Sequence, residues 1–233
     1  MSWDHTLFSL VIAVVAHPSR RRKGFLYTAN MPNTVEYILL ICALVLLGVR
    51  CVLFTGVHFY HREHTPPFTP FRTTLSEYGT GEGRPMFTAM GMVTLLAYVL
   101  IAVSLGISHI ASWPWLVLLA FAIWSQFMLF LFPMDDLTQE ARTRTGKLHS
   151  IFALLGFILF YIFVIFVPLS ASWAQSGWIT SAVVLTHLGF WSMLLVAVIP
   201  ALRCVVGLAE RIYLIAVPYW FLAVAALWLA TGY

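Results

Sequence analysis

Charged residues are scarce in this chain: they make up 9% of its 233 residues, whereas 61% of the residues are hydrophobic. An ordinary soluble domain carries about 25% charged and about 45–50% apolar residues. The composition therefore excludes an ordinary soluble domain. The apolar residues form continuous runs and do not alternate with polar ones, which argues against a transmembrane β-barrel.

The chain also lacks the short motifs of several enzyme classes. HExxH, HxxxH and Gly-x-Ser-x-Gly are all absent, which argues against zinc and serine hydrolases. The glycine-rich segment 80–83 matches neither a P-loop nor a dinucleotide fingerprint. The three cysteines form no CxxC pair, so we interpret them as small buried hydrophobic residues. The sequence predicts no metal site and indicates no particular cofactor.

What the chain has instead is long apolar segments, and a bilayer core needs roughly 20 apolar residues per helix. The segments that meet this length lie at about residues 36–60, 86–109, 112–132, 148–168, 178–201 and 212–230. No connection is long enough to hold a soluble domain. The sequence predicts an all-α, polytopic integral membrane six-helix bundle over residues 35–233, preceded by a separate N-terminal segment, residues 1–34.

The N-terminal segment has an apolar run, Leu7–Ala16, that is too short to span a bilayer. A basic cluster, Arg20–Lys23, follows this run, whereas a signal peptide carries its positive charge before the apolar run. Two interpretations remain open. The segment forms a short interfacial helix, or translation begins at Met31.

The distribution of basic residues predicts an orientation. We call face B the side of the bundle formed by the connections 61–85, 133–147 and 202–211, and face A the opposite side. The face-B connections carry eight Lys and Arg residues, whereas the two face-A loops between spans carry none. The positive-inside rule then makes face B cytoplasmic, in a plasma membrane such as the bacterial inner membrane. We attribute the pI near 9.1 to this topology and not to nucleic-acid binding, and membrane lipids are the expected partners.

Arg50 lies near the middle of the first apolar segment, where a charged side chain costs about 2.5–3.5 kcal/mol and needs a partner. No acidic residue occupies the middle of another segment. Gln126 and His187 are further intramembrane polar residues. The simplest expectation is that Arg50 bonds to backbone carbonyls or polar side chains. Snorkelling, an anionic ligand in a pocket and a partner from another subunit are alternatives.

Polar residues from four segments converge on face B. Ser76, Asp135, Asp136 and His149 are candidate catalytic residues, because a carboxylate and a histidine can form a general acid–base pair. Candidate ligand-binding residues, several of them able to hold a phosphate or lipid headgroup, are Glu77, Arg142, Arg144, Lys147, Glu210 and Arg211. Helix capping and interfacial ion pairing are the simplest interpretation of the same residues.

Four short motifs occur in order on face B: Leu-Ser-Glu-Tyr-Gly from residue 75, Phe-Pro-Met-Asp-Asp from 132, Gly-Lys-Leu-His-Ser from 146 and Gly-Leu-Ala-Glu-Arg-Ile from 207. With these motifs the chain, over about residues 35–230, resembles the family of multi-pass membrane proteins called domain of unknown function 998. The resemblance implies six helices. It also implies a shared polar site built from Ser76, Asp135 or Asp136, His149, Glu210 and Arg211. Arg50 does not belong to this pattern.

Three hypotheses about function follow. The first is a face-B site that binds a lipid headgroup or another anionic small molecule. The second is a non-catalytic accessory subunit of a larger membrane complex, such as an energy-transducing one, with protein partners. The third is an intramembrane lipid hydrolase, which the missing histidine pairs argue against.

Overall fold

The computed structural model describes residues 33–64, 69–80, 83–135 and 143–231. In chain order the elements are α2 (Thr34–His64), the 3₁₀ helix η1 (Ser76–Gly79), α3 (Arg84–Ile107), α4 (Trp113–Leu131), α5 (Arg144–Phe166), the short α6 (Ala171–Ala174), α7 (Gly177–Val198), the 3₁₀ helix η3 (Pro200–Val205) and α8 (Val206–Thr231). The described residues contain no β-strand. The interfacial helix expected in the N-terminal segment lies outside them.

Six of the helices in the described ranges are long and apolar enough to span a membrane: α2, α3, α4, α5, α7 and α8. The predicted all-α membrane bundle is therefore confirmed. The structure moves some boundaries. α5 begins at Arg144, because Thr143 accepts a hydrogen bond from the Gly146 amide and caps the helix. α8 begins at Val206, so Glu210 and Arg211 lie in its first two turns and not in the preceding connection.

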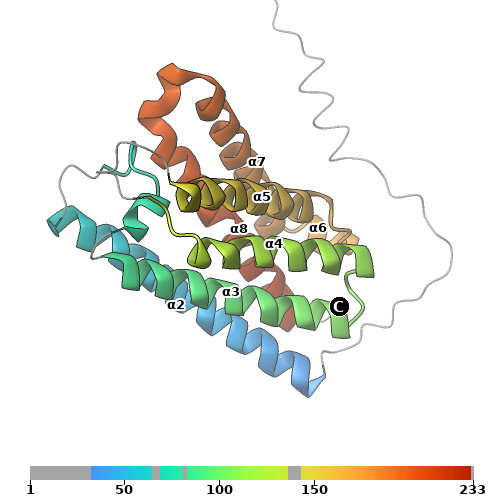
Figure 1. Ribbon diagram of the computed structural model, residues 1–233. Coiled ribbons are helices and arrows are strands. Elements are labelled where there is room, and N and C mark those ends of the chain that lie inside the picture. The colour runs from blue at the N-terminus through green and yellow to red at the C-terminus, as the bar shows by residue number, and fades with distance from the viewer. Residues whose placement is uncertain (1–32, 65–68, 81–82, 136–142, 232–233) are drawn as a thin grey trace, which may run out of the picture. The chain divides into compact units, whose positions relative to one another are not determined.

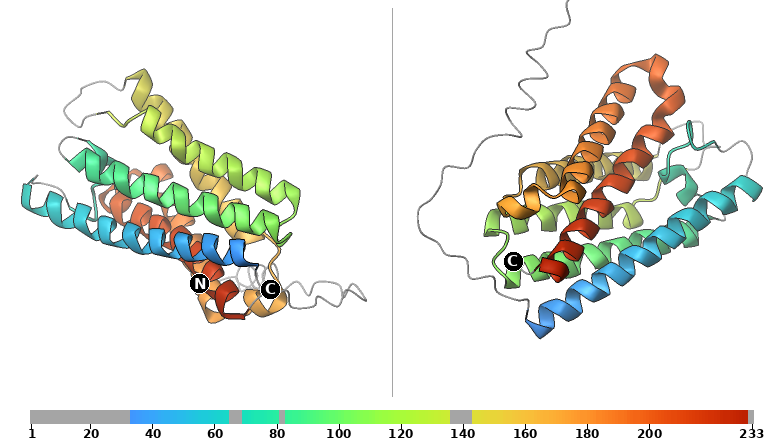
Figure 2. Two further views of the ribbon diagram at one scale, coloured as in Figure 1. Left: turned by 90° about the horizontal axis from the view of Figure 1, so that it is seen from below. Right: turned by 180° about the vertical axis from the view of Figure 1, so that it is seen from behind.

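The six spans pack as three antiparallel hairpins, α2–α3, α4–α5 and α7–α8 (Figures 1 and 2). α8 is the central helix, since it contacts α2, α3 and α5 as well as its own partner α7. Its buried side includes the large rings of Tyr213, Trp220, Phe221 and Trp228. α7 and α8 approach most closely at Gly189, where a β-carbon would collide with the backbone of Tyr213.

α2 has two apolar sides with different surroundings. One side is exposed and carries Ile38, Val45, Val49 and Val52, as expected for a surface that faces lipid. The opposite side is buried, and Arg50 continues the 3–4 spacing of its apolar members Leu40, Ala43 and Leu47. Arg50 therefore points into the bundle.

The cysteines correct one expectation from the sequence. Cys42, Cys51 and Cys204 are all exposed, although we had predicted them to be buried. An apolar side chain on a membrane helix can face lipid without the cost that it would have in water, so hydrophobicity alone does not indicate burial here.

Candidate functional site

The connection between α2 and α3 is bound to the start of α8 by two buried charged residues. The Glu210 carboxylate accepts hydrogen bonds from the Leu75 amide and, at 3.2 Å, from the Ser76 hydroxyl. Arg211 Nη1 donates to the carbonyl oxygens of Pro70 at 2.7 Å and Thr73 at 2.6 Å. These bonds join the first and last of the face-B motifs.

Aromatic rings complete the surroundings of Arg211. Its guanidinium carbon lies 5.0 Å from the centre of the Tyr78 ring, a cation–π distance. Its Nε donates to His58 Nε2 at 2.7 Å, and His58 Nδ1 is 2.7 Å from the Phe54 carbonyl oxygen. A guanidinium can only donate, so this histidine is neutral with its proton on Nδ1. Burial raises the pKa of the Tyr78 hydroxyl, and Arg211 acts in the opposite direction.

Gly207 explains why the connection can lie so close to α8. A β-carbon at this position would collide with the carbonyl oxygens of Thr73 and Pro70 and with the Arg211 guanidinium. The Gly207 amide instead donates to the Phe71 carbonyl oxygen at 2.8 Å. We call the contacts of Glu210, Arg211 and Gly207 with residues 69–79 the first latch.

A second latch joins the end of α4 to the start of α5. Asp135 accepts from the Thr143 hydroxyl and, at 2.9 Å, from the Thr143 amide. A β-carbon at Gly146 would occupy the position of this carboxylate. His149 Nδ1 lies 2.8 Å from the Phe132 carbonyl oxygen, which fixes its proton on that nitrogen. The second latch therefore joins the second and third motifs.

Between the two latches lies a cavity of about 150 Å³, which we call the outer cavity. Its polar lining comprises Ser76, Arg84, Thr88 and His149. His149 is 5% exposed, and its Nε2 is buried without a hydrogen-bond partner among the described residues. Because Nδ1 carries the proton, Nε2 is an unused acceptor. Arg84 is exposed at the start of α3 and contributes a positive charge.

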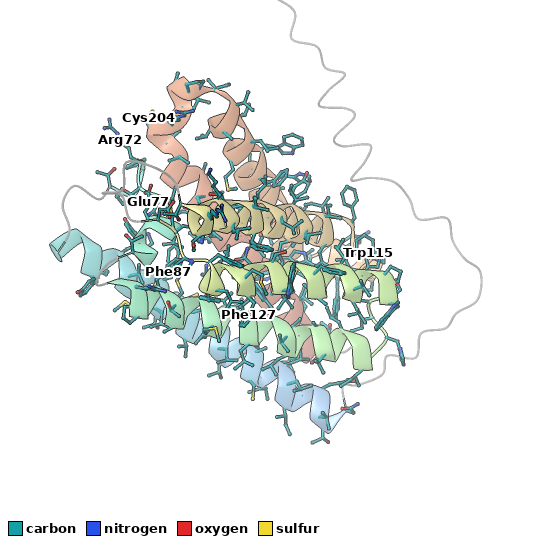
Figure 3. All side chains as sticks on the ribbon, viewed as in Figure 1. Arg72, Glu77, Phe87, Trp115, Phe127 and Cys204 are labelled. Atoms are coloured by element: carbon teal, nitrogen blue, oxygen red, sulfur yellow. The ribbon has the colours of Figure 1, made fainter. Side chains whose placement is uncertain are left out.

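A deeper cavity of about 100 Å³, the inner cavity, adjoins the outer one and shares the lining residues Ser76, Phe87, Leu129 and Phe130 with it. Its walls come from α2, α3, α4, α5 and α8 and are mainly apolar. Its polar lining comprises Arg50, Ser76, Thr94, Tyr98, Gln126, Glu210 and Tyr213. Figure 3 places Glu77 and Phe87 toward the face-B end of the bundle and Trp115 toward face A. Phe87 lines both cavities, and the inner one extends from there toward the middle of the bundle, where Arg50 and Pro218 line it.

The partner of Arg50 is a backbone carbonyl that a proline leaves free. Pro218 lies inside α8 and has no amide hydrogen, so the carbonyl four residues earlier, that of Leu214, loses its helical donor. Arg50 Nη2 donates to this Leu214 oxygen, and the guanidinium lies 5.1 Å from the centre of the Phe54 ring. The contact of Arg50 is therefore of the kind that we expected as the simplest, a hydrogen bond to a backbone carbonyl. We had separated Arg50 from the polar face-B site, yet it lines the adjoining cavity.

Several predicted site residues have structural contacts of their own. Glu77, within the short helix η1, accepts from the Thr74 amide at 2.7 Å. His187 bonds to the Tyr161 hydroxyl at 2.9 Å, between α5 and α7, and lines neither cavity. Arg144 and Lys147 are exposed at the start of α5. Asp136 and Arg142 lie outside the described residues.

Among the candidate catalytic residues that the structure describes, Ser76, Asp135 and His149 do not form a Ser–His–Asp triad. Ser76 donates to Glu210, and His149 Nδ1 bonds to a backbone carbonyl and not to Asp135. Across the ranges that the structure describes, no group of three or more His, Cys, Asp or Glu side chains could hold a metal ion.

Sequence reasoning missed four residues that line the cavities or set their contacts. From the sequence, Arg84 was counted among the basic residues of the connection 61–85, and Thr88 was assigned to the second apolar segment, 86–109. Tyr98 was hidden among apolar neighbours. Pro218 offered a readable signal, because a proline within an apolar helix always frees one carbonyl.

Comparison with protein families gives one match, to the family described as "Protein of unknown function (DUF998)", over residues 51–227. Comparison with curated proteins and with solved structures gives no match. The matched range contains all four face-B motifs and both latches, and it begins one residue after Arg50. Since the family model covers most of the 233 residues, this integral membrane protein belongs to the DUF998 family.

Proposed function

We propose that the protein binds an anionic lipid at face B, with the polar headgroup in the outer cavity. The observation that carries this proposal is the buried Nε2 of His149, an acceptor without a partner among the described residues that lines a polar cavity. A buried acceptor of this kind costs about 1–3 kcal/mol unless something donates to it. A ligand hydroxyl would supply the missing donor.

The other groups of the outer cavity favour an anion. Arg84 carries a positive charge, and Thr88 supplies a hydroxyl. Further exposed cations lie on face B outside the cavity: Arg72, Arg144, Lys147 and Arg203. Basic side chains near a membrane surface attract anionic lipids in general, without selecting a headgroup. A phosphate that bears a free hydroxyl, as in a glycerol phosphate headgroup, matches both Arg84 and His149.

This function needs no chemical step. The proposed orientation, with face B in the cytoplasm, would place the cavity at the inner leaflet, where anionic lipids are abundant. The accessory-subunit alternative drew in part on the absence of an obvious partner for Arg50 within the chain. The bond from Arg50 to Leu214 weakens that part of its support.

Two single-residue substitutions, one at His149 and one at Arg84, test the proposal. His149→Asn keeps a donor near the Nδ1 position, for the Phe132 carbonyl, and deletes the acceptor at Nε2. We expect this variant to stay folded and to lose about three- to tenfold in affinity for phosphatidylglycerol, since one hydrogen bond between uncharged groups is worth about 0.5–1.5 kcal/mol. Arg84→Gln should weaken binding similarly. Binding is measured by native mass spectrometry of the purified protein.

The control is Arg203→Gln, which removes an exposed cation from the same face but outside the cavity. Its affinity should change by less than about threefold, because the cation lies in high-dielectric surroundings. Phosphatidylcholine, which has no headgroup hydroxyl and no net charge, should bind more weakly to the unmodified protein. Wild-type affinity for phosphatidylglycerol in both His149→Asn and Arg84→Gln would rule out the outer cavity as the headgroup site.

A further inference from the structure

The inner cavity brings together three polar groups with unused hydrogen-bonding capacity. Arg50 has five N–H groups and uses one of them, toward Leu214, among its described contacts. The Tyr98 hydroxyl and the Gln126 amide also line the cavity, and neither has a hydrogen bond within the described part of the chain. All three can donate. They lie on three different helices, α2, α3 and α4.

The charges around the inner cavity do not balance. In this half of the bundle the buried charged residues of the described chain are Arg50, Glu210 and Arg211. Glu210 has its countercharge in the adjacent Arg211, and its oxygens accept from Leu75 and Ser76. Arg50 has a carbonyl and an aromatic ring but no carboxylate. One positive charge therefore remains in a mainly apolar environment, where an unpaired ion is costly.

We propose that the inner cavity is a binding site for a single carboxylate, held by Arg50 with Tyr98 and Gln126 as further donors. A carboxylate carries one negative charge, which matches one guanidinium, and a guanidinium fork binds it with good geometry. The cavity of about 100 Å³ suits a small head better than a bulky phosphodiester with two ester arms. Apolar walls, including Leu95, Phe160 and Val217, suit the methylene groups next to the carboxylate.

This inference does not rest on the proposed function, because it uses different side chains and a different ligand group. The carboxylate could belong to a long-chain fatty acid that enters from the bilayer or to a short alkyl acid that enters from face B. The two sources share the same chemistry at Arg50. They differ in chain length, and this difference separates them in an experiment.

The experiment compares matched ligands on the full-length protein in detergent. Octanoate and palmitate should raise the thermal unfolding temperature and bind saturably, whereas octanol and hexadecanol, which lack the charge, should bind at least about tenfold more weakly. Palmitate partitions into the micelle more strongly than octanoate because of its added methylene groups. If palmitate binds to the protein more strongly than this partitioning accounts for, the acid enters from the bilayer. Equal affinity, after that correction, would indicate a site filled from water.

The variants Tyr98→Phe and Gln126→Leu remove donors that the described chain does not use for its own hydrogen bonds, so both should fold. Each should weaken carboxylate binding at least about tenfold, the loss expected for one hydrogen bond to a charged group. The matched control is Tyr219→Phe, the same chemical change at a hydroxyl that contacts Ser181 and does not line the cavity. It should leave the affinity unchanged.

Arg50→Gln should abolish the preference for acid over alcohol, but this variant also disturbs the Leu214 contact. If Arg50→Gln does not fold, the variants Tyr98→Phe and Gln126→Leu decide whether the inner cavity binds a carboxylate. The proposal fails if acids and alcohols bind equally, if no acid binds, or if Tyr98→Phe and Gln126→Leu both bind carboxylates as the unmodified protein does.

Discussion

At the scale of single residues, the notable pair is Arg50 and Pro218. Each would be unfavourable alone in a membrane helix: a guanidinium needs an acceptor, and a proline leaves a carbonyl without a donor. The bond from Arg50 to the Leu214 carbonyl satisfies both needs at once. The position of the arginine in the first span is thus explained by a proline in the last one.

This pairing predicts non-additive stability. Arg50→Met leaves the Leu214 carbonyl buried without a donor, and Pro218→Ala gives that carbonyl a backbone donor and takes the acceptor from Arg50. Each change should lower the free energy of unfolding by about 1–3 kcal/mol. The double variant has neither an orphan carbonyl nor an unpaired charge, so its loss should be at least about 1 kcal/mol smaller than the sum of the single losses.

Unfolding in mixed micelles with increasing denaturing detergent measures these differences. Pro85→Ala is the control, because Pro85 lies in the first turn of α3, where no carbonyl four residues earlier depends on it. Its combination with Arg50→Met should be additive. Additive losses in the Arg50–Pro218 pair would show that the two residues are independent.

At the scale of elements, the four motifs are explained by two latches that hold connections against helix starts. Sequence order placed the motifs on one face, and the resemblance grouped them into one site. The structure instead separates them into two structural pairs, with an unused acceptor, His149 Nε2, between the pairs. The pairing of the first motif with the last could not be read from the sequence, because it depends on bonds between residues more than 130 positions apart, such as Ser76 with Glu210.

The first latch predicts how the connection responds to protease. Arg211→Met removes the donor to the carbonyl oxygens of Pro70 and Thr73, so residues 69–79 should detach from α8. Trypsin cleavage after the exposed Arg72 should then accelerate at least about tenfold, since cleavage follows the population of the open segment. Gel analysis over time measures the rate. Arg144→Met, an exposed cation outside the latch, should leave cleavage after Arg72 at the wild-type rate.

The packing of α7 against α8 gives a second prediction at this scale. A side chain at Gly189 has no room beside the Tyr213 backbone, so Gly189→Val should force the two helices apart and lower the free energy of unfolding by about 1–3 kcal/mol or more. Gly48→Ala on the exposed side of α2, where a β-carbon meets nothing within 4 Å, should change stability by less than about 0.5 kcal/mol. Thermal unfolding in detergent compares the two, and equal effects would contradict the close approach.

At the scale of the whole molecule, composition and continuous apolar runs were sufficient to predict six spans and an all-α bundle. They could not predict which side of each helix faces the interior, because both sides are apolar. The two sides of α2 differ in burial and hardly in hydrophobicity. For the same reason the exposure of Cys42 and Cys51 could not be anticipated from their apolar surroundings.

The predicted orientation can be tested with a natural cysteine. Cys204 is exposed in η3, at face B. In the variant Cys42→Ser/Cys51→Ser, Cys204 is the remaining thiol. A membrane-impermeant maleimide should label it in inside-out vesicles and not in intact cells, because the positive-inside rule places face B in the cytoplasm. Labelling in intact cells would reverse the orientation, and with it the leaflet proposed for the lipid site.

The separation of 164 positions between Arg50 and its acceptor Leu214 has a consequence for biosynthesis. The ribosome delivers the arginine with the first described span and the Leu214 carbonyl with the last, so every intermediate that lacks α8 holds a membrane-embedded cation without that partner. The same late helix brings Glu210 and Arg211, which fasten residues 69–79. Insertion of α8 thus supplies both sets of contacts together, and a chain truncated before it should hold Arg50 in the membrane without its carbonyl acceptor.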